Sequence, residues 1–231
     1  MSENLKTSFN RVRKNALTIM KCVYDPFHDE KHALEVELTA IKLYRALPPA
    51  TVASVNLEQL RLVSVLHDTS REVIGTNFLL EPLLGGFMSG SIAYRQLIDA
   101  GYSTEYARYI RFVILNHESL LGLWKYKEDT LGQLLSDADT IEAYSERRFQ
   151  RGIEYFKRKR FSNIFLNMYM IGLLIMDRYS PPELFFEHSR ALFEKNISEL
   201  KIFFIENRTV LKEVLYRPLY RFLYSHDFLS T

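Results

Sequence analysis

Apolar residues recur three and four positions apart along most of this chain, which is the spacing of one face of an α-helix. The pattern predicts helices over residues 4–23, 28–47, 57–69, 89–100, 104–116 and 130–159, with further helices after residue 160. Asn56 stands where its side chain can cap the third of them. No run alternates between apolar and polar residues for long enough to form a strand. The sequence therefore predicts an all-α fold.

Glycine and proline mark where these helices should end, because proline disfavours helix in the residue before it and glycine weakens a helix interior. They stand at positions 26, 48–49, 75, 85–86, 101 and 181–182. We expect irregular structure around 75–77 and 85–86, a loop over 121–128, and a kink near Asp137 in the helix that begins at 130.

Length and composition are typical of one globular domain. The chain has 231 residues, of which 47% are apolar and 25% are charged. We expect a single domain over 1–231, in which a helical extension over 160–231 packs on a core over 20–155. Aromatic residues of the extension should pack internally or form a homo-oligomer interface: Phe185, Phe186, Phe203, Phe204, Tyr216, Tyr220 and Tyr224.

The charge balance gives no support for nucleic acid as a partner. The net charge of +2 is too small to indicate it. A basic run over 147–160 holds seven Lys and Arg residues against one acid, Glu154. No nucleic-acid-binding motif accompanies this run, so we interpret it as a solvated helix face.

Cysteine usage and the apolar segments predict a cytoplasmic protein without a membrane partner. Cys22 is the only cysteine, so no intrachain disulfide can form. The N-terminal residues are polar and lack the apolar core of a signal peptide. The most apolar later segment, 164–176, is too short to span a bilayer.

The helix over 57–69 brings an imidazole and a carboxylate, His67 and Asp68, directly after a run of residues that bury. Such groups are costly to bury unless something binds them, and a divalent cation can do so. His32 and Asp137 can reach the same point from other helices, as side chains on facing helices of a bundle do. This mixture of imidazole and carboxylate ligands suits Mn, Fe, Co, Ni or Zn, and Mg is a further candidate.

Four stretches occur in order along the chain: YDPFHDEKHALEV, LVSVLHDTSRE, VILNHESL and LLSDADTIEA. They lie within roughly residues 20–155 and resemble the HD superfamily of metal-dependent phosphohydrolases. The resemblance implies an HD-type helical bundle with additional C-terminal helices, and one divalent ion as cofactor. Its ligands would be His32, His67, Asp68 and Asp137. The implied reaction is phosphoester hydrolysis in a nucleotide or another small phosphorylated metabolite.

The chain departs from the family pattern at two places. Glu35 stands where the family often has an arginine, which puts a phosphate contact from that position in doubt. Family members that bind two metals have a further histidine before the VILNHESL stretch, and residues 83–91 contain none. We therefore expect one ion rather than two.

Proton transfer needs a group close to the ligands. Glu72 follows the His-Asp pair by four residues, so its carboxylate could orient or deprotonate a water. We expect Glu72, Asp68 and His117 to be the catalytic residues. The alternatives are a salt bridge from Glu72 to Arg71 and an ordinary core or surface role for His117.

Substrate contacts are expected from three further residues. His28 lies one helical turn before the first ligand, on the same face, where it could line the pocket or cap the helix. Arg151 follows Asp137 by 14 residues and returns to its face about 21 Å along the helix. Arg151 and Arg148 would bind phosphate charge, unless they form structural ion pairs. Asp139 should point away from Asp137, and we interpret it as structural.

Two other functions stay open at this stage. Glu35 and the incomplete second site allow a non-catalytic sensor or protein-interaction module on the same fold. An HD-type oxygenase with two irons is the other, although the missing histidine argues against it.

Overall fold

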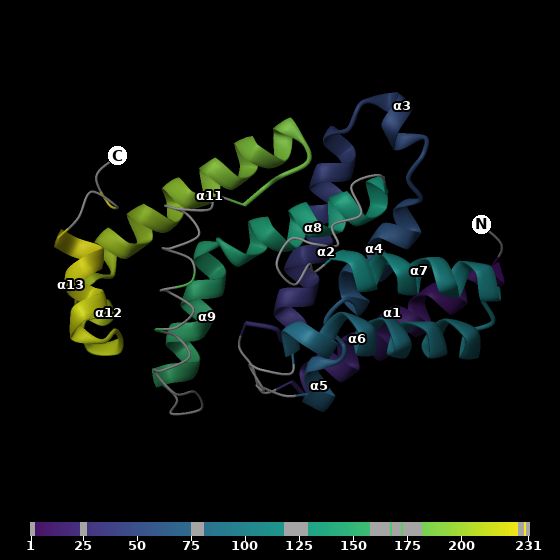
Figure 1. Cartoon of the computed structure of the whole chain (residues 1–231), viewed down its shortest axis with the longest axis horizontal. Coiled ribbons are helices and arrows are strands. Elements are labelled where there is room, and N and C mark those ends of the chain that lie inside the picture. Colours follow the sequence, from purple (N-terminus) through teal and green to yellow (C-terminus); the bar gives the residue numbers. More distant parts are fainter. Residues whose placement is uncertain are drawn as a thin grey trace. The chain divides into compact units, whose positions relative to one another are not determined.

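The computed structural model describes residues 3–23, 27–74, 81–117, 129–157, 167, 172, 182–225 and 229. Over these ranges every regular element is a helix, which confirms the all-α fold. The chain divides into two compact units, Met1–Glu142 and Ala143–Thr231. Figure 1 labels the helices of both units. None of the described helices has the length and apolar character that crossing a bilayer would need.

The first unit contains eight helices among the described residues. They are α1 (Glu3–Lys21), α2 (Glu30–Ala46), α3 (Pro49–Val52), α4 (Leu57–Leu66), α5 (Arg71–Ile74), α6 (Glu81–Asp99), α7 (Thr104–His117) and α8 (Thr130–Ala143). The side chain of Asn56 caps α4 as predicted, because its Oδ1 accepts from the amides of Glu58 and Gln59.

Helix α4 is the centre of this unit. Five consecutive residues from Leu62 to Leu66 are buried, and α4 packs against α1, α2, α6 and α7. A helix that is buried around its whole circumference reads as a continuous apolar run in the sequence. This burial places the end of α4, where the His-Asp pair stands, inside the unit.

A charged network joins α1, α2 and α4. The carboxylate of Glu37, which is 3% exposed, accepts a hydrogen bond from Arg13 Nε that both of its oxygens share, and one at 2.6 Å from Arg13 Nη2. Arg61 Nε donates to the same carboxylate at 2.8 Å, and its guanidinium lies over the Phe9 ring. Two cations therefore satisfy one buried anion and tie the three helices together.

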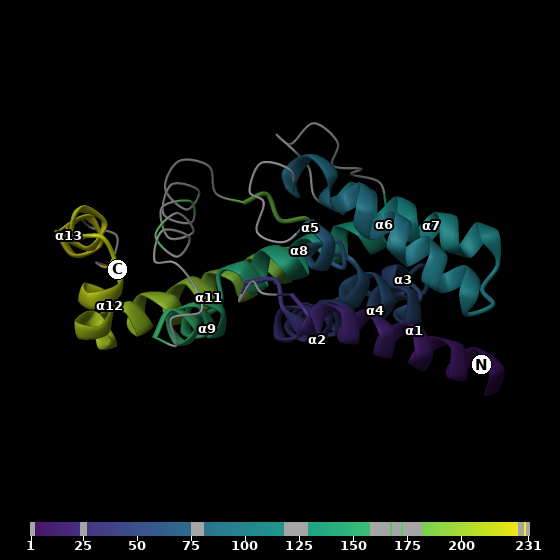
Figure 2. The same ribbon diagram turned by 90° about the horizontal axis from the view of Figure 1, so that it is seen from below.

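Helices α6 and α7 pack as an antiparallel pair, side by side in Figures 1 and 2. Cβ atoms added at Gly86 and Gly90 would lie only 3.3 and 3.1 Å from the nearest atoms of Leu115 and Arg111 on α7. Glycine therefore lets the two backbones approach. This explains why the prediction of irregular structure at 85–86 is wrong: α6 already begins at Glu81.

Three other predicted boundaries are also corrected. α2 begins at Glu30 rather than at residue 28, because the side chain of Asp29 caps it by accepting from the His32 amide. α4 ends at Leu66, and residues 67–70 form a turn. α8 continues through Asp137, and the helix predicted over 130–159 breaks at residues 144–145. Residues 75–77 and 121–128, predicted to be irregular, lie outside the described residues.

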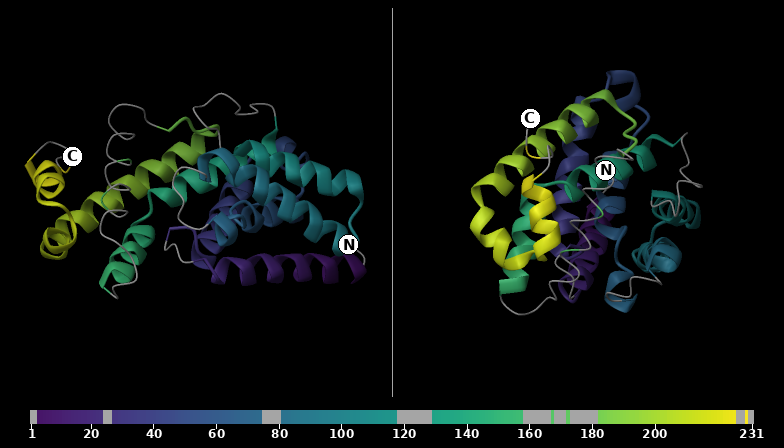
Figure 3. Two further views of the ribbon diagram at one scale, coloured as in Figure 1. Left: turned by 60° about the horizontal axis from the view of Figure 1, so that its bottom comes forward. Right: turned by 60° about the vertical axis from the view of Figure 1, so that its left-hand side comes forward.

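In the second unit the described helices are α9 (Glu146–Lys157), α11 (Glu187–Glu206), α12 (Arg208–Val214) and α13 (Arg217–Ser225), seen in two orientations in Figure 3. Aromatic contacts hold α9 to α11, since the Phe149 and Phe204 rings meet edge to face at 5.1 Å. Residues 164–176 fall outside the described residues, except for 167 and 172. The predicted packing of the C-terminal extension on the core stays a prediction.

Candidate metal centre

Three separate helices bring acceptor atoms to one point of the first unit. His32 is in the first turn of α2, His67 and Asp68 follow the end of α4, and Asp139 is on α8. The Nε2 atoms of His32 and His67 lie 3.2 Å apart. Asp68 Oδ2 lies 3.3 and 3.4 Å from these two nitrogens. Asp139 Oδ1 lies 3.4 and 3.8 Å from them.

The other nitrogen of each imidazole is already committed to an acceptor. His32 Nδ1 donates to Glu142 Oε2 at 2.7 Å, and His67 Nδ1 donates to the Ser64 carbonyl at 2.8 Å. A carboxylate or carbonyl oxygen can only accept, so the proton of each ring is on Nδ1. In the neutral rings both Nε2 atoms therefore carry a lone pair.

The protonation states follow from burial and charge. Burial lowers the pKa of His67, which favours the neutral ring. Burial by itself would raise the pKa of Asp68, but the charge of Arg71 and the hydrogen bond with His32 contribute to holding the pKa of that carboxyl well below its usual range. A neutral imidazole beside an ionised carboxylate is the state in which both are metal ligands.

The geometry fits a divalent cation. Two lone pairs at 3.2 Å and two carboxylate oxygens beside them repel one another unless positive charge lies between them. A shared proton would join only one pair of these atoms, whereas one cation can bind all four. Ligands at about 2.1 Å from an ion are separated by about 3.0 Å in an octahedral and about 3.4 Å in a tetrahedral arrangement. The five separations that include an imidazole nitrogen, 3.2 to 3.8 Å, are close to these values.

His117, the last residue of α7, is next to this cluster. Its ring meets the His67 ring edge to face, with the ring centroids 5.1 Å apart. His67, His117 and Asp139 each offer one ligand atom, and these three atoms lie within 4.8 Å of one another. His117 Nδ1 donates to the Ile114 carbonyl, which leaves a lone pair on Nε2. That Nε2 is buried and has no hydrogen-bond partner among the residues that the structure describes. A buried polar atom without a partner needs an explanation, and a bound group at the centre supplies one.

The turn that carries the His-Asp pair is held by hydroxyl groups. The Thr69 hydroxyl donates to the Leu66 carbonyl at 2.9 Å. Ser89 on α6 accepts from the Ser70 amide at 3.0 Å and donates to the Ser70 hydroxyl at 2.9 Å. Because these groups are buried, the turn is fixed to both α4 and α6.

The structure corrects the interpretation of Asp139. His32, His67 and Asp68 come together as predicted, but Asp139 joins them rather than pointing away. Asp137 is fully buried on the same helix. Two positions two residues apart on a helix are about 200° apart, so they point to opposite sides. The role of Asp137 as a ligand stays a prediction.

The residues that the structure places beside the centre differ from those that the sequence suggested. Glu72, the predicted proton carrier, is exposed on α5. Arg71 is the buried one, with its Nε 3.8 Å from Asp68 Oδ1. Glu142 was missed entirely, although it lies three residues after Asp139 and so shares its helix face. That spacing was a signal the sequence offered.

The three predicted substrate contacts lie in different places. His28 is half-buried, and its ring meets that of His32 edge to face at 5.6 Å, as expected for a residue beside the first ligand. Arg148 and Arg151 are buried on α9, which belongs to the second unit. Their predicted contact with substrate stays a prediction.

The centre opens on one side. Asp139 is 26% exposed, whereas the side chains of His32, His67 and Asp68 are at most 5% exposed. Solvent or a ligand can therefore reach the cluster past Asp139. Comparisons of the chain with protein-family models, with curated proteins and with solved structures found no match, so the chemistry of this centre carries the functional argument.

Proposed function

We propose that this protein is a metal-dependent phosphohydrolase of the HD superfamily that acts on a nucleotide or another small phosphorylated metabolite. The observation that carries the proposal is that carboxylate oxygens of Asp68 and Asp139 lie 3.3 to 3.8 Å from two imidazole nitrogens, which Glu142 and Ser64 hold in the ligand tautomer. The proposed ligands are His32, His67, Asp68 and Asp139. This set replaces Asp137 by Asp139 in the pattern that the resemblance implied.

The choice of a catalytic over a purely structural site rests on access. Structural sites are closed by protein ligands, whereas catalytic sites keep positions open for water and substrate. Four protein ligands leave about two positions on an octahedral ion, and the exposure of Asp139 puts an entrance beside them. A mixture of imidazole and carboxylate suits Mn, Fe, Co, Ni or Zn more than Ca.

A bound divalent ion would polarise a phosphoryl oxygen and lower the pKa of a coordinated water. The chain's own residues supply the rest. Glu142 fixes the ring of His32 through Nδ1, so its Nε2 stays aimed at the centre. His117 Nε2 carries a lone pair and can accept the proton that the attacking water loses. The Arg71 guanidinium offsets part of the negative charge of the carboxylates, so a phosphate can approach.

The direct test is metal analysis of the purified protein, combined with hydrolysis assays over nucleoside mono-, di- and triphosphates with added Mn, Co, Ni or Mg. We expect about one ion per chain and metal-dependent release of phosphate or pyrophosphate. An ion without turnover of any phosphorylated compound would favour the sensor. A stoichiometry of two irons would favour the oxygenase. A chain that binds no divalent ion would refute all three.

A further inference from the structure

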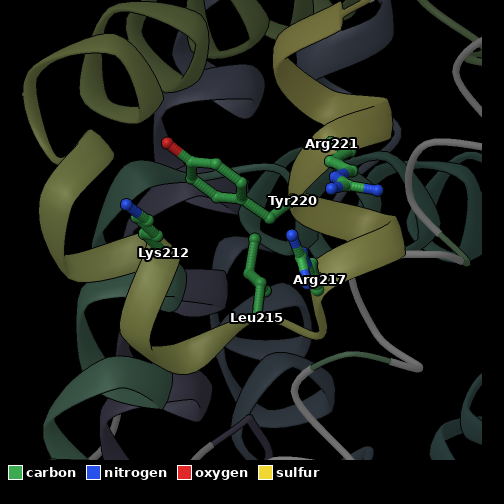
Figure 4. A pocket seen from close by; sticks show the side chains of 5 residues that line it. All are labelled: Lys212, Leu215, Arg217, Tyr220 and Arg221. Atoms are coloured by element: carbon green, nitrogen blue, oxygen red, sulfur yellow. The ribbon is translucent and has the colours of Figure 1, made fainter.

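A cavity of about 420 Å³ lies in the second unit, between α12 and α13. Lys212 and Leu215 line it from α12 and the residue after it, and Arg217, Tyr220 and Arg221 line it from α13. Figure 4 shows the Tyr220 ring and Leu215 in the middle, with Lys212 on one side and both arginines on the other. An apolar floor is thus flanked by cations from two helices.

No carboxylate among the described residues pairs with the cations of this cavity. The segment 208–225 holds four Lys and Arg residues and one acid, Glu213. In the part of the chain that the structure describes, Lys212, Arg217 and Arg221 form no ion pair with a carboxylate. Three like charges around one cavity repel one another, and an anion bound between them would relieve that repulsion.

The aromatic floor is held in place by its neighbours. The Tyr220 hydroxyl accepts from Arg208 Nε at 3.1 Å, and the Tyr220 ring lies 4.7 Å from that of Tyr224. Tyr224 in turn donates through its hydroxyl to the Phe204 carbonyl and lies under the Arg208 guanidinium. A ring fixed in this way can take a flat ligand group without a cost in rotamer freedom.

We propose that this cavity binds a nucleoside phosphate, with the base against Tyr220 and the phosphates at Arg217, Arg221 and Lys212. Arginine presents a planar fork that matches phosphate oxygens, and an aromatic ring provides a stacking surface that accepts any base. The volume lies within the range of small-molecule sites. This site is separate from the metal centre, and the proposal does not depend on the proposed hydrolase activity.

The test is calorimetric titration of the full-length protein with ADP in excess EDTA, which removes divalent ions from the metal centre. The test variant is Arg217→Ala/Arg221→Ala. The matched control is Arg190→Ala/Lys195→Ala, which removes two exposed cations near the start of α11. Circular dichroism and thermal unfolding check that each variant folds.

We expect ADP to bind the wild-type chain, the control to bind within about twofold of it, and the test variant to bind at least about tenfold more weakly. We also expect ADP to bind more tightly than inorganic pyrophosphate. The proposal is overturned if ADP at millimolar concentration gives no binding, or if the control loses as much affinity as the test variant. Pyrophosphate binding as tight as ADP would overturn the role of Tyr220.

A membrane surface is the competing interpretation, because Phe222 on α13 and Tyr216 just before this helix are also exposed near the arginines. Co-sedimentation with vesicles of phosphatidylcholine and phosphatidylserine separates the two. If the wild-type chain sediments with the vesicles, the test variant does not, and ADP fails to bind, then the surface recognises anionic lipid and the nucleoside phosphate proposal is wrong.

Discussion

Replacing Asp139 by asparagine should remove most of the metal affinity, while replacing Asp137 by asparagine should leave it largely intact. The two residues share one helix and one chemistry, and differ in the side of α8 that they face. Asp139 Oδ1 lies 3.4 Å from His32 Nε2, and a residue two positions earlier on a helix is about 200° away from it. Both variants remove the same carboxylate charge from α8, so a difference in metal affinity between them reports the position of the side chain.

The expected size follows from what the change removes. Disturbing a residue that only orients a ligand costs about 10–100-fold in metal affinity. Asp139→Asn removes a charged ligand itself, so we expect a loss at the upper end or beyond, at least about a hundredfold, or about 2.8 kcal/mol. Asp139 is 26% exposed and Asp137 fully buried, so the Asp139 variant should disturb the fold less. A greater loss of metal from the milder variant cannot be attributed to unfolding.

The assay is titration of each metal-free variant with Mn²⁺ or Co²⁺ by calorimetry, supported by elemental analysis and a thermal unfolding curve. Asp139→Glu serves as a conservative control that keeps the charge and should recover part of the affinity. The reasoning fails if Asp139→Asn binds the ion as tightly as the wild-type chain. Loss of the ion from Asp137→Asn alone, with the fold retained, would restore the original assignment of the fourth ligand.

Four further predictions follow from the same contacts. Glu142→Gln keeps a hydrogen-bond acceptor but removes its charge, so metal affinity should fall about tenfold, and unchanged affinity by calorimetry would contradict its orienting role. His117→Gln should lower the hydrolysis rate at least about a hundredfold at unchanged metal content, because its unpartnered Nε2 is proposed to take the proton, and equal rates would exclude it. Glu37→Gln should lower the free energy of unfolding by about 2 kcal/mol in urea titrations, since it leaves the cations of Arg13 and Arg61 without their anion, and a change below about 0.5 kcal/mol would show that solvent replaces it. Adding the bound ion at about 100 times its Kd should raise the unfolding free energy by about 2.7 kcal/mol, seen as a higher melting temperature that EDTA reverses.

The sequence by itself determined the helical class and the part of the metal centre that is local in the chain. An apolar run flanked by Asn56 and the His-Asp pair predicts a buried helix, and α4 begins at Leu57 as the cap requires. His67 and Asp68 are adjacent in sequence, so any fold that buries the end of α4 places them together. For such residues, adjacency in the sequence is enough to predict that the side chains lie close together in the fold.

Only the tertiary structure decided which face of α8 turns toward the ligands. Asp137 and Asp139 are both aspartates on one helix, and nothing local distinguishes them. The choice between opposite faces depends on how the whole helix packs, which sets its rotation about its own axis. Glu142 reaches His32 across 110 positions of sequence for the same reason.

The choice between Glu72 and Arg71 has a related cause. A projection of one helical turn beyond the His-Asp pair assumes that the helix continues, but α4 ends at Leu66 and a turn over 67–70 follows. The turn changes the direction of the chain, so Arg71 is buried beside Asp68 and Glu72 faces solvent. Helical periodicity holds only while the helix lasts, and the contacts of Ser70 with Ser89 on another helix help to hold this turn.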